Sequence, residues 1–409
     1  MSQSKRVIAI VGAGPAGLMA ADILSKDGKL VHVFDAMPSA GRKFLLAGKS
    51  GMNLSHAEDM TRFLTRYPKS SDQLRYALSK FDCQAIRGWA LDLGIETFVG
   101  SSGRVFPSDM KAAPLLRAWI QRLRNQSVIF HMRHKWVGVE GEDLIFENAG
   151  KMTRQSFSAI VFAMGGASWK RLGSDATWVS TFTNLGVSIS PFEPSNCGFS
   201  VDWSSHFSEK FAGTPLTNVR ARLDEEDNLD TRQGQFVITK RGVEGSLIYA
   251  LSSEIRRHIH HNGYVNLYLD LTPGKSCDRV YNEVKASRGS KSISAHLRGK
   301  LGLHPIHVGL LYETLGKEAM MDHEILARAI KKMKITLQEP FPIDEAISSA
   351  GGVSFESVDD QMMLKLKPGW FCAGEMLDWD APTGGYLLSA CFATGVAAAR
   401  GVEKWLFDK

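Results

Sequence analysis

Apolar runs and amphipathic stretches alternate along the first 35 residues in the manner of an α/β protein. Residues 6–11 (RVIAIV) form a short apolar, β-branched run typical of a buried parallel strand. Residues 18–26 (LMAADILSK) have helical spacing, and residues 31–35 (VHVFD) form a second strand-like run. The three segments together predict a βαβ unit at the start of the chain.

The pattern changes several times further along the chain. Helices are expected within 60–95 and 111–124, and strands around 136–163. Residues 191–271 are strand-like with few helical stretches, and residues 272 to about 338 are helical. Strand signals return after Pro340, so the pattern predicts a discontinuous α/β domain interrupted by a β-rich piece and a helical piece. The expected boundaries are 1–190 plus 340–409, 191–271 and 272–339.

The loop of the predicted βαβ unit carries a GxGxxG motif at Gly12, Gly14 and Gly17. In this setting the first glycine permits the tight turn, the second lets a pyrophosphate approach the backbone, and the third lets the helix pack on the strand. The acidic Asp35 ends the second strand, where it can meet ribose hydroxyls. The motif alone is a weak signal, but its position between a strand and a helix predicts dinucleotide binding.

Three later features favour FAD over a nicotinamide dinucleotide. Gly41-Arg42-Lys43 follows soon after Asp35, and a predicted strand ends in AMGG at 163–166. Near the C-terminus, Ala373-Gly374-Glu375 follows another strand, and a glycine pair at 384–385 then opens a helix of small residues. A nicotinamide site has no use for this returning element, whereas in many flavoproteins an acid at this position holds the ribitol. Since only one GxGxxG is present, no second nucleotide domain is expected.

With these motifs the chain resembles a family of bacterial FAD-dependent oxidoreductases that includes YhiN, BaiN and aminoacetone oxidase-like proteins. The resemblance covers nearly the whole length and is carried by the segments 11–21, 41–56, 103–116, 161–168, 242–249 and 373–395. It implies a Rossmann-like FAD-binding domain interrupted by a β-barrel-like domain and a small helical domain. The chain has Gly51-Met52-Asn53 where many members have Arg-Cys-Asn, so it looks like a distinct branch and the substrate is not carried over.

The resemblance also implies which residues contact the cofactor. The ADP half would be bound by the first strand, its turn and the second strand end, with Val137 as a backbone contact to adenine. The flavin half would be bound by Asn53 and the C-terminal element. The implied residues are Gly12, Ala13, Gly14, Pro15, Ala16, Gly17, Asp35, Ala36, Gly41, Arg42, Lys43, Asn53, Val137, Ala163, Met164, Gly165, Gly374, Glu375, Asp378, Gly384, Gly385, Tyr386 and Leu387.

Composition narrows the class of protein. The chain of 409 residues has no segment apolar enough to span a bilayer and begins without a signal-peptide pattern, so a cytoplasmic protein is expected. Its five cysteines (Cys83, Cys197, Cys277, Cys372 and Cys391) show no CxxC spacing and are expected to be small buried hydrophobes. Residues 256–334 contain 14 Lys and Arg against 7 Asp and Glu, which suits either an anionic partner such as ribosomal RNA or a solvated helical surface.

Candidate proton donors and substrate contacts are few. Arg104, Ser108 and Lys111 lie in a segment that either lines the pocket or is a structural loop, and His56 is either a proton donor or a structural histidine. Lys240 and Arg241 suit an anionic substrate or a surface turn equally well. The histidines at 258, 260 and 261 match no metal-ligand spacing and are interpreted as a polar helix end, so no metal is expected.

These observations leave three hypotheses about function. The first is an oxidoreductase that passes hydride through the flavin N5, with NAD(P)H as donor and a small carbonyl, amine or enone substrate bound between the FAD domain and the inserted domains. The second, implied by the resemblance, is a flavoenzyme that reduces uridine to dihydrouridine in ribosomal RNA. The third is a flavin-binding redox sensor or assembly partner without turnover.

Overall fold

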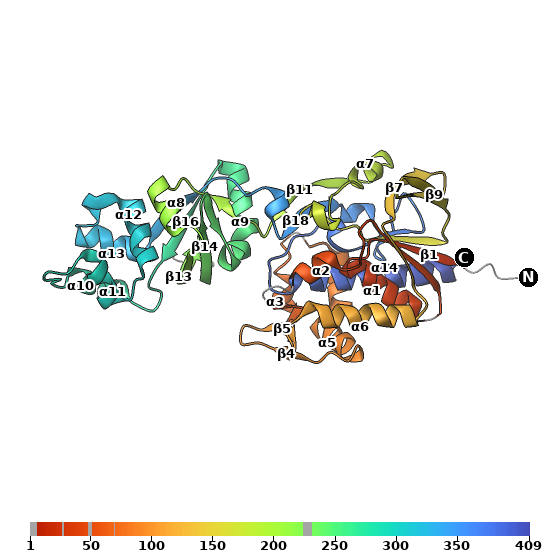
Figure 1. Ribbon diagram of the computed structural model, residues 1–409, viewed down its shortest axis with the longest axis horizontal. Helices are drawn as coiled ribbons and strands as arrows, with labels where there is room; N and C mark the ends of the chain where they lie inside the picture. The colour runs from red at the N-terminus through yellow and green to blue at the C-terminus, as the bar shows by residue number, and fades with distance from the viewer. Residues whose placement is uncertain (1–5, 27, 48–50, 69, 224–230) are drawn as a thin grey trace, which may run out of the picture. The chain divides into compact units, whose positions relative to one another are not determined.

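The computed structural model describes residues 6–26, 28–47, 51–68, 70–223 and 231–409. Its internal contacts divide the chain into two compact units, Met1–Ser195 with Ile343–Lys409 and Asn196–Pro342. Figure 1 shows that the first unit contains both β1 and α14, from the early and the late part of the chain. Within the described residues, no helix is both long and apolar enough to cross a membrane.

The first unit is built on a five-stranded parallel sheet with the order β19-β10-β1-β2-β6. Val11 of the central strand lies opposite Phe162 on one side and Phe34 on the other. These three positions are buried, as expected for a sheet covered on both faces. The strands are β1 (Val7–Val11), β2 (Leu30–Asp35), β6 (Ile129–Met132), β10 (Ala159–Phe162) and β19 (Trp370–Cys372).

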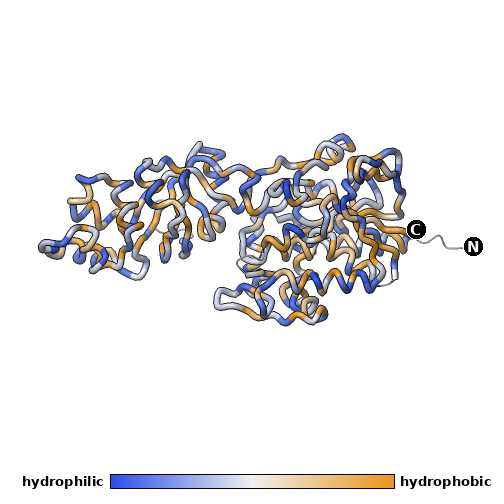
Figure 2. The backbone as a smooth tube through the Cα atoms, viewed as in Figure 1, coloured by the Kyte–Doolittle hydropathy of each residue, from blue (hydrophilic) through white to orange (hydrophobic). Residues whose placement is uncertain are grey.

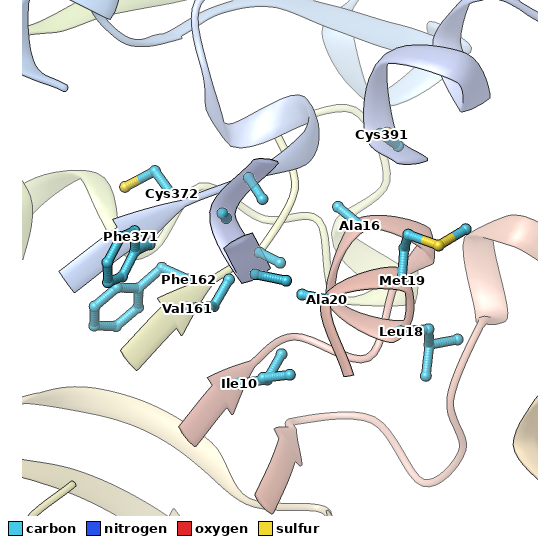
Figure 3. Close-up of a cluster of buried hydrophobic side chains, with 14 of the residues drawn as sticks. Ile10, Ala16, Leu18, Met19, Ala20, Val161, Phe162, Phe371, Cys372 and Cys391 are labelled. Carbon is cyan, nitrogen blue, oxygen red and sulfur yellow. The ribbon is translucent and has the colours of Figure 1, made fainter. Parts of the chain in front are cut away.

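Two helices pack side by side against this sheet (Figure 1). They are α1 (Pro15–Ser25) and α14 (Tyr386–Phe407). A Cβ added at Gly395 of α14 would lie 2.4 Å from the Ala16 carbonyl oxygen, so the small residues of α14 permit this close approach. Figure 3 shows Ile10 and Val161 of the sheet in one apolar cluster with Met19 and Ala20 of α1. Figure 2 shows apolar residues gathered in the same central elements.

The remaining elements of this unit surround the parallel sheet. Strands β3, β5 and β4 form one antiparallel sheet, β7, β8 and β9 form another, and β11 pairs with β18. These strands are β3 (Ser55–His56), β4 (Thr97–Val99), β5 (Arg104–Pro107), β7 (Lys135–Glu140), β8 (Asp143–Asn148), β9 (Lys151–Gln155), β11 (Ile189–Ser195) and β18 (Ser348–Val353). The helices are α2 (Arg42–Ala47), α3 (Met60–Leu64), α4 (Asp72–Lys80), α5 (Cys83–Asp92), α6 (Ala112–Asn125) and α7 (Val179–Asn184), with 3₁₀ turns at Lys170–Leu172, Ile343–Glu345, Phe355–Ser357 and Gly374–Met376.

The second unit contains a six-stranded antiparallel sheet with the order β12-β15-β14-β13-β16-β17. Ser200 exchanges backbone hydrogen bonds with residues 338–339, which follow the last strand, and the sheet thereby closes on itself. The strands are β12 (Phe199–Ser200), β13 (Pro215–Arg222), β14 (Arg232–Thr239), β15 (Gly242–Glu244), β16 (Val265–Asp270) and β17 (Met333–Leu337). The helices are α8 (Ser205–Phe211), α9 (Ser246–Asn262), α10 (Cys277–Lys285), α11 (Ile293–Leu301), α12 (Pro305–Ala319) and α13 (His323–Lys331).

Residues 246–262, in the region expected to be mostly strand with few helical stretches, form the long helix α9, because the apolar residues Leu247, Leu251 and Ile255 recur every four positions and are buried. One expectation about this region was wrong. Residues 333–337 form strand β17 rather than helix and pair with β16. The sheet and helices α10–α13 lie in one compact unit, and their separation into two domains near residue 271 stays a prediction.

The cysteines divide into two groups. Cys197, Cys372 and Cys391 are buried, as expected, whereas Cys277 is exposed and Cys83 is half-buried. Cys277 is the first residue of helix α10, whose buried positions begin only at Val280. The expectation that every cysteine is a buried hydrophobe is therefore wrong for Cys277.

Candidate functional site

The three glycines of the GxGxxG motif lie at the turn between β1 and α1. The structure explains the absence of a side chain differently at each position. Gly12 has a φ of +109°, and a Cβ there would lie 2.2 Å from the Ala163 carbonyl oxygen. A Cβ at Gly17 would lie 1.9 Å from the Gly12 carbonyl oxygen. At Gly14, by contrast, an added Cβ would meet no described atom within 4 Å. The protein's own packing therefore explains two of the glycines and leaves open space over the third.

Helix α1 begins beside this open space without a side-chain cap. Its N-cap is Gly14, and Pro15 stands at the first helical position. The N–H groups of the first turn of a helix and its positive dipole end favour an anion. The turn thus combines room for a ligand with donors suited to a phosphate.

Asp35 lies at the end of β2 next to the same turn. Its Oδ2 accepts a hydrogen bond from the Ala13 N–H at 2.7 Å, and its Oδ1 accepts one from the Met37 N–H at 2.7 Å. Burial raises the pKa of the Asp35 carboxyl, although these two hydrogen bonds and the charge of Arg42 act in the opposite direction. Each carboxylate oxygen keeps a second lone pair, so Asp35 is still able to accept a hydroxyl donor.

Lys43 and Glu375, which are 332 residues apart, form an ion pair in this unit. Lys43 Nζ lies 2.6 Å from Glu375 Oε2 and donates a hydrogen bond to Ser168 Oγ at 2.9 Å. Glu375 Oε1 also accepts a hydrogen bond from the Ser349 N–H at 3.0 Å. The two predicted segments GRK and GEM are therefore joined directly, and Ser168 and Ser349 complete the group.

The turn that carries Glu375 packs on the start of α1. Gly374 has a φ of +79°, and a Cβ there would lie 2.7 Å from the Ala16 Cβ. The Gly374 N–H donates to Thr394 Oγ1 of α14 at 2.9 Å. Further on, Asp378 Oδ2 accepts from Ser190 Oγ at 2.6 Å. The two predicted cofactor-binding segments, around residues 12–17 and 374–378, are thus in contact.

The protein's own packing explains the glycine pair before α14. Gly384 and Gly385 have φ angles of +129° and +99°, and Gly385 is the N-cap of α14. A Cβ at Gly385 would lie 2.5 Å from the backbone carbonyl of Ser55, and a Cβ at Gly384 would lie 3.1 Å from the Tyr386 ring. The bare helix start was expected to clear room for a ligand, but contact with β3 already requires a glycine at 385.

Tyr386 belongs to a hydrogen-bonded group of four side chains. Its hydroxyl donates to Glu58 Oε1 at 2.6 Å, and its carbonyl accepts from the Tyr67 hydroxyl at 2.7 Å. Arg66 binds both oxygens of Glu58, at 3.1 and 2.9 Å. Burial would raise the pKa of Glu58, but the hydrogen bonds from Arg66 and Tyr386 outweigh it and lower that pKa. Burial, followed by the interaction with Glu58, raises the pKa of Tyr386 well above its ordinary value. This group holds the first turn of α14 in place.

The candidate catalytic side chains occupy different positions around this group. The His56 ring stacks on Tyr386 with centroids 5.4 Å apart, and its two nitrogens face the Ser102 carbonyl and the Glu58 N–H. A neutral ring that donates from Nε2 and accepts at Nδ1 fits both partners, as expected of a structural histidine. Arg104 on β5 is the cross-strand neighbour of His56 on β3. Lys111 is exposed at the start of α6.

Within the predicted cofactor set, three polar atoms are buried and have no hydrogen-bond partner among the described residues. They are Arg42 Nε, Asn53 Oδ1 and Asp378 Oδ1. Buried polar atoms are normally satisfied, so each orphan needs an explanation such as a bound group. All three belong to the predicted cofactor set. Together with the open space at Gly14, they fit a polar ligand with phosphate and hydroxyl groups.

The other predicted residues are distributed as follows. The Gly41 N–H donates to the Ala13 carbonyl at 2.9 Å, which brings the GRK segment to the motif. Met164 and Gly165 follow β10, and the Gly165 carbonyl accepts from Trp178 Nε1 at 3.1 Å. Ala36 is exposed, Leu387 is half-buried in α14, and Val137 is 41% exposed on β7. Residues 48–50 of the motif segment 41–56 lie outside the described residues.

Two candidates outside this unit have local explanations. Arg241 stacks on the ring of Phe341, its guanidinium carbon 4.1 Å from the ring centroid, next to Lys240 in the turn after β14. The histidines at 258, 260 and 261 lie near the C-terminal end of α9, which confirms the interpretation as a helix end.

Sequence reasoning missed the side chains that support the site from a distance. Glu58, Arg66 and Tyr67 were expected only as parts of helices or loops, and Ser168 and Ser349 carried no signal. Their partners are between 8 and 328 residues away in the sequence, and no local pattern predicts such pairings.

Comparison with protein families places nearly the whole chain in one of them. Residues 6–401 match the family described as HI0933-like protein Rossmann domain. One relative, a 3-dehydro-bile acid delta(4,6)-reductase of Clostridium scindens, is 26% identical over 420 residues that cover 96% of this chain and 98% of the relative. A ribosomal RNA dihydrouridine synthase of Haemophilus influenzae is 22% identical over 99% of this chain and 100% of the relative.

Solved structures show the same fold at low identity. A 3-ketosteroid delta1-dehydrogenase from Sterolibacterium denitrificans has a TM-score of 0.55 at 10% identity, over 98% of this chain and 100% of that chain. A flavocytochrome c3 fumarate reductase has a TM-score of 0.54 at 14% identity, over 99% of this chain and 79% of that chain. These likenesses establish the fold and carry no substrate to this chain.

Proposed function

Since the chain belongs to the HI0933-like Rossmann family and is an FAD-dependent oxidoreductase, we propose that it reduces a carbon–carbon double bond conjugated to a carbonyl in a small molecule. NAD(P)H is the proposed hydride donor. The observation that carries the cofactor's placement is the open space over Gly14, beside an uncapped helix start. The name of the bile acid reductase relative favours a small-molecule reduction.

We assign the ADP half of FAD to the segment around residues 12–17 and the end of β2. The first-turn N–H groups of α1 bind the pyrophosphate where Gly14 lets it approach the backbone. Asp35 accepts a hydrogen bond from a ribose hydroxyl with the lone pairs that Ala13 and Met37 leave free. Arg42, whose buried Nε lacks a partner among the described residues, faces the phosphates, and Val137 lies on the adenine side.

We assign the flavin half of FAD to the segment around residues 374–378 and the start of α14. Asp378 Oδ1 and Asn53 Oδ1 supply unused acceptors for the ribitol and the ring edge, and Glu375 stands beside them in its pair with Lys43. The positive end of α14 favours negative charge at the pyrimidine edge. When bound, FAD supplies hydride transfer at N5, and the protein's groups orient its partners.

The test is an anaerobic half-reaction series on the purified protein loaded with FAD. NADH or NADPH should bleach the visible flavin absorbance, and 2-cyclohexenone, a small conjugated enone, should restore it with formation of cyclohexanone. Bleaching without restoration by any conjugated enone in a panel would reject the substrate class. A protein that takes up no FAD would reject the whole assignment.

A second candidate, reduction of uridine in ribosomal RNA, is favoured by one feature of the second unit. Four cations on and between α10 and α11 are exposed, and clustered cations of this kind bind phosphates. They are Lys285, Arg288, Lys291 and Arg298. Two relatives, from Haemophilus influenzae and Escherichia coli, are named ribosomal RNA dihydrouridine synthases.

The RNA candidate is tested by changing three of these cations to glutamine. Each lost phosphate contact should reduce the slope of log affinity against log salt by about 1, measured by filter binding of ribosomal RNA. The matched control changes three exposed arginines of the first unit. The test triple is Arg288, Lys291 and Arg298, and the control triple is Arg75, Arg117 and Arg124. Equal effects of both triples, together with unchanged dihydrouridine in ribosomal RNA from a deletion strain, would rule this function out.

A further inference from the structure

The two faces of the small antiparallel sheet β3-β5-β4 carry different side chains. Arg104 lies directly opposite His56 on β3, and Phe106 lies opposite Phe98 on β4. Because side chains alternate along a strand, Arg104 and Phe106 lie on the same face of the sheet. Their cross-strand partners His56 and Phe98 lie on that face as well. Val105, between Arg104 and Phe106, is fully buried on the other face. The face with Arg104 therefore carries a cation at one end and two aromatic rings at the other.

The aromatic end of this face is partly exposed. The rings of Phe98 and Phe106 stack with centroids 5.7 Å apart, and Phe98 is 40% exposed. Glycines stand beside both edges of the Phe106 ring: a Cβ at Gly51 would lie 3.7 Å from Cε1, and one at Gly100 would lie 3.3 Å from Cε2. Met110 adjoins Gly51 and is 40% exposed. The result is a partly exposed apolar surface made of Phe98, Phe106 and Met110.

The cationic end lies beside the start of α14. Arg104 Nε would be 3.8 Å from a Cβ placed on Gly384. Among the described residues, the half-buried Arg104 side chain has no hydrogen bond and no ion pair. Nearby side chains already have partners: Glu58 binds Arg66 and Tyr386, and the His56 ring faces two backbone groups. Within the described part of the chain, the guanidinium thus keeps its donors for another molecule.

We propose that this face binds the substrate, and that the substrate is a compact ring compound with a carboxylate or carbonyl oxygen. The oxygen binds the Arg104 guanidinium, and the ring packs on Phe98 and Phe106. The inference deepens the proposed function and rests on it, because Arg104 lies beside the helix start assigned to the flavin ring. An arginine fork suits such an oxygen through paired N–H donors, and aromatic rings favour offset stacking on another flat ring. Arg104 acts here as a substrate-positioning residue.

The probe is 2-naphthoate, a fluorescent aromatic ring acid, and its binding is measured by equilibrium dialysis, which does not depend on flavin. Loss of a hydrogen bond to a charged group corresponds to a roughly 10- to 100-fold increase in Kd for Arg104→Gln. Arg104→Lys should recover part of the affinity, since the charge remains and the fork is lost. Phe106→Leu should weaken 2-naphthoate by several-fold and leave acetate, which has no ring, unchanged. Arg117→Gln, an exposed cation on α6, is the matched control.

The same titration followed through the visible absorbance of FAD-loaded protein separates the two proposals. A spectral shift that saturates at the dialysis Kd supports a site beside the flavin ring. Binding that depends on Arg104 without any spectral shift would keep the ring-acid site and reject the proposed flavin position. Absence of 2-naphthoate binding to the wild-type protein, or equal Kd values for wild type and Arg104→Gln with unchanged thermal melting, would overturn the inference whatever the flavin does.

Discussion

The substitution Gly14→Ala should separate cofactor binding from folding. Gly14 has a φ of −80° and a ψ of −178°, which any residue can adopt, and the added methyl would meet no described atom within 4 Å. Reduced freedom of the unfolded chain raises the free energy of unfolding of the FAD-free protein by about 0.4–1 kcal/mol. Alanine is a poorer N-cap than glycine, so the two effects oppose each other and the net change should stay within about 1 kcal/mol.

The same methyl occupies the space through which the pyrophosphate reaches the backbone. Losing one charge-assisted hydrogen bond costs about 1.5–3 kcal/mol, so the Kd for FAD should rise by roughly 10- to 100-fold or more. The assay is titration of FAD-free protein with FAD, followed by quenching of flavin fluorescence, beside urea denaturation of the same preparations.

Two other glycines calibrate this experiment. Gly88→Ala places a methyl on the exposed side of helix α5, also without an atom within 4 Å, and should leave FAD affinity unchanged. Gly17→Ala forces a Cβ to within 1.9 Å of the Gly12 carbonyl oxygen, and overpacking of this kind costs about 1–3 kcal/mol of folding free energy or more. Wild-type FAD affinity in Gly14→Ala, or destabilisation of its FAD-free form as large as that of Gly17→Ala, would refute the reasoning.

Three further predictions concern contacts around the site and the sheet. A double-mutant cycle on Lys43→Met and Glu375→Gln should give a coupling of about 0.5–3 kcal/mol in urea denaturation, and a zero coupling would contradict the ion pair. Tyr67→Phe removes the donor to the Tyr386 carbonyl and should cost about 1 kcal/mol of unfolding free energy; Tyr76→Phe, at an exposed tyrosine, is the control. Burial, with the charges of His32 and His134, lowers the pKa of His131 from 6.5 to about 4, so the folded protein keeps this ring neutral while the unfolded chain binds a proton. Its contribution to stability is therefore complete above about pH 6.5 and is lost as the pH falls towards 4. His131→Phe should flatten the dependence of unfolding free energy on pH in that window, and an unchanged slope would count against this account.

Much of the architecture could be predicted from local sequence because its causes are local. The apolar run 7–11, the glycine motif and the acid at 35 specify a strand, a turn and a second strand within one short segment. The helix after the glycine pair was also expected, and α14 begins at Tyr386. In contrast, β17 was misassigned, since it depends on pairing with β16, which lies elsewhere in the sequence.

The candidate site divides in the same way. The sequence by itself determined the residue types that a dinucleotide needs, because bare backbone at Gly14 and an acid at Asp35 follow from short-range spacing. Only the tertiary structure decided that Lys43 pairs with Glu375, that Gly385 must be bare for Ser55, and that Arg104 has no partner among the described residues. The contacts at Glu375 and Gly385 join segments hundreds of residues apart, and they arise from the packing of whole elements, which no local spacing encodes.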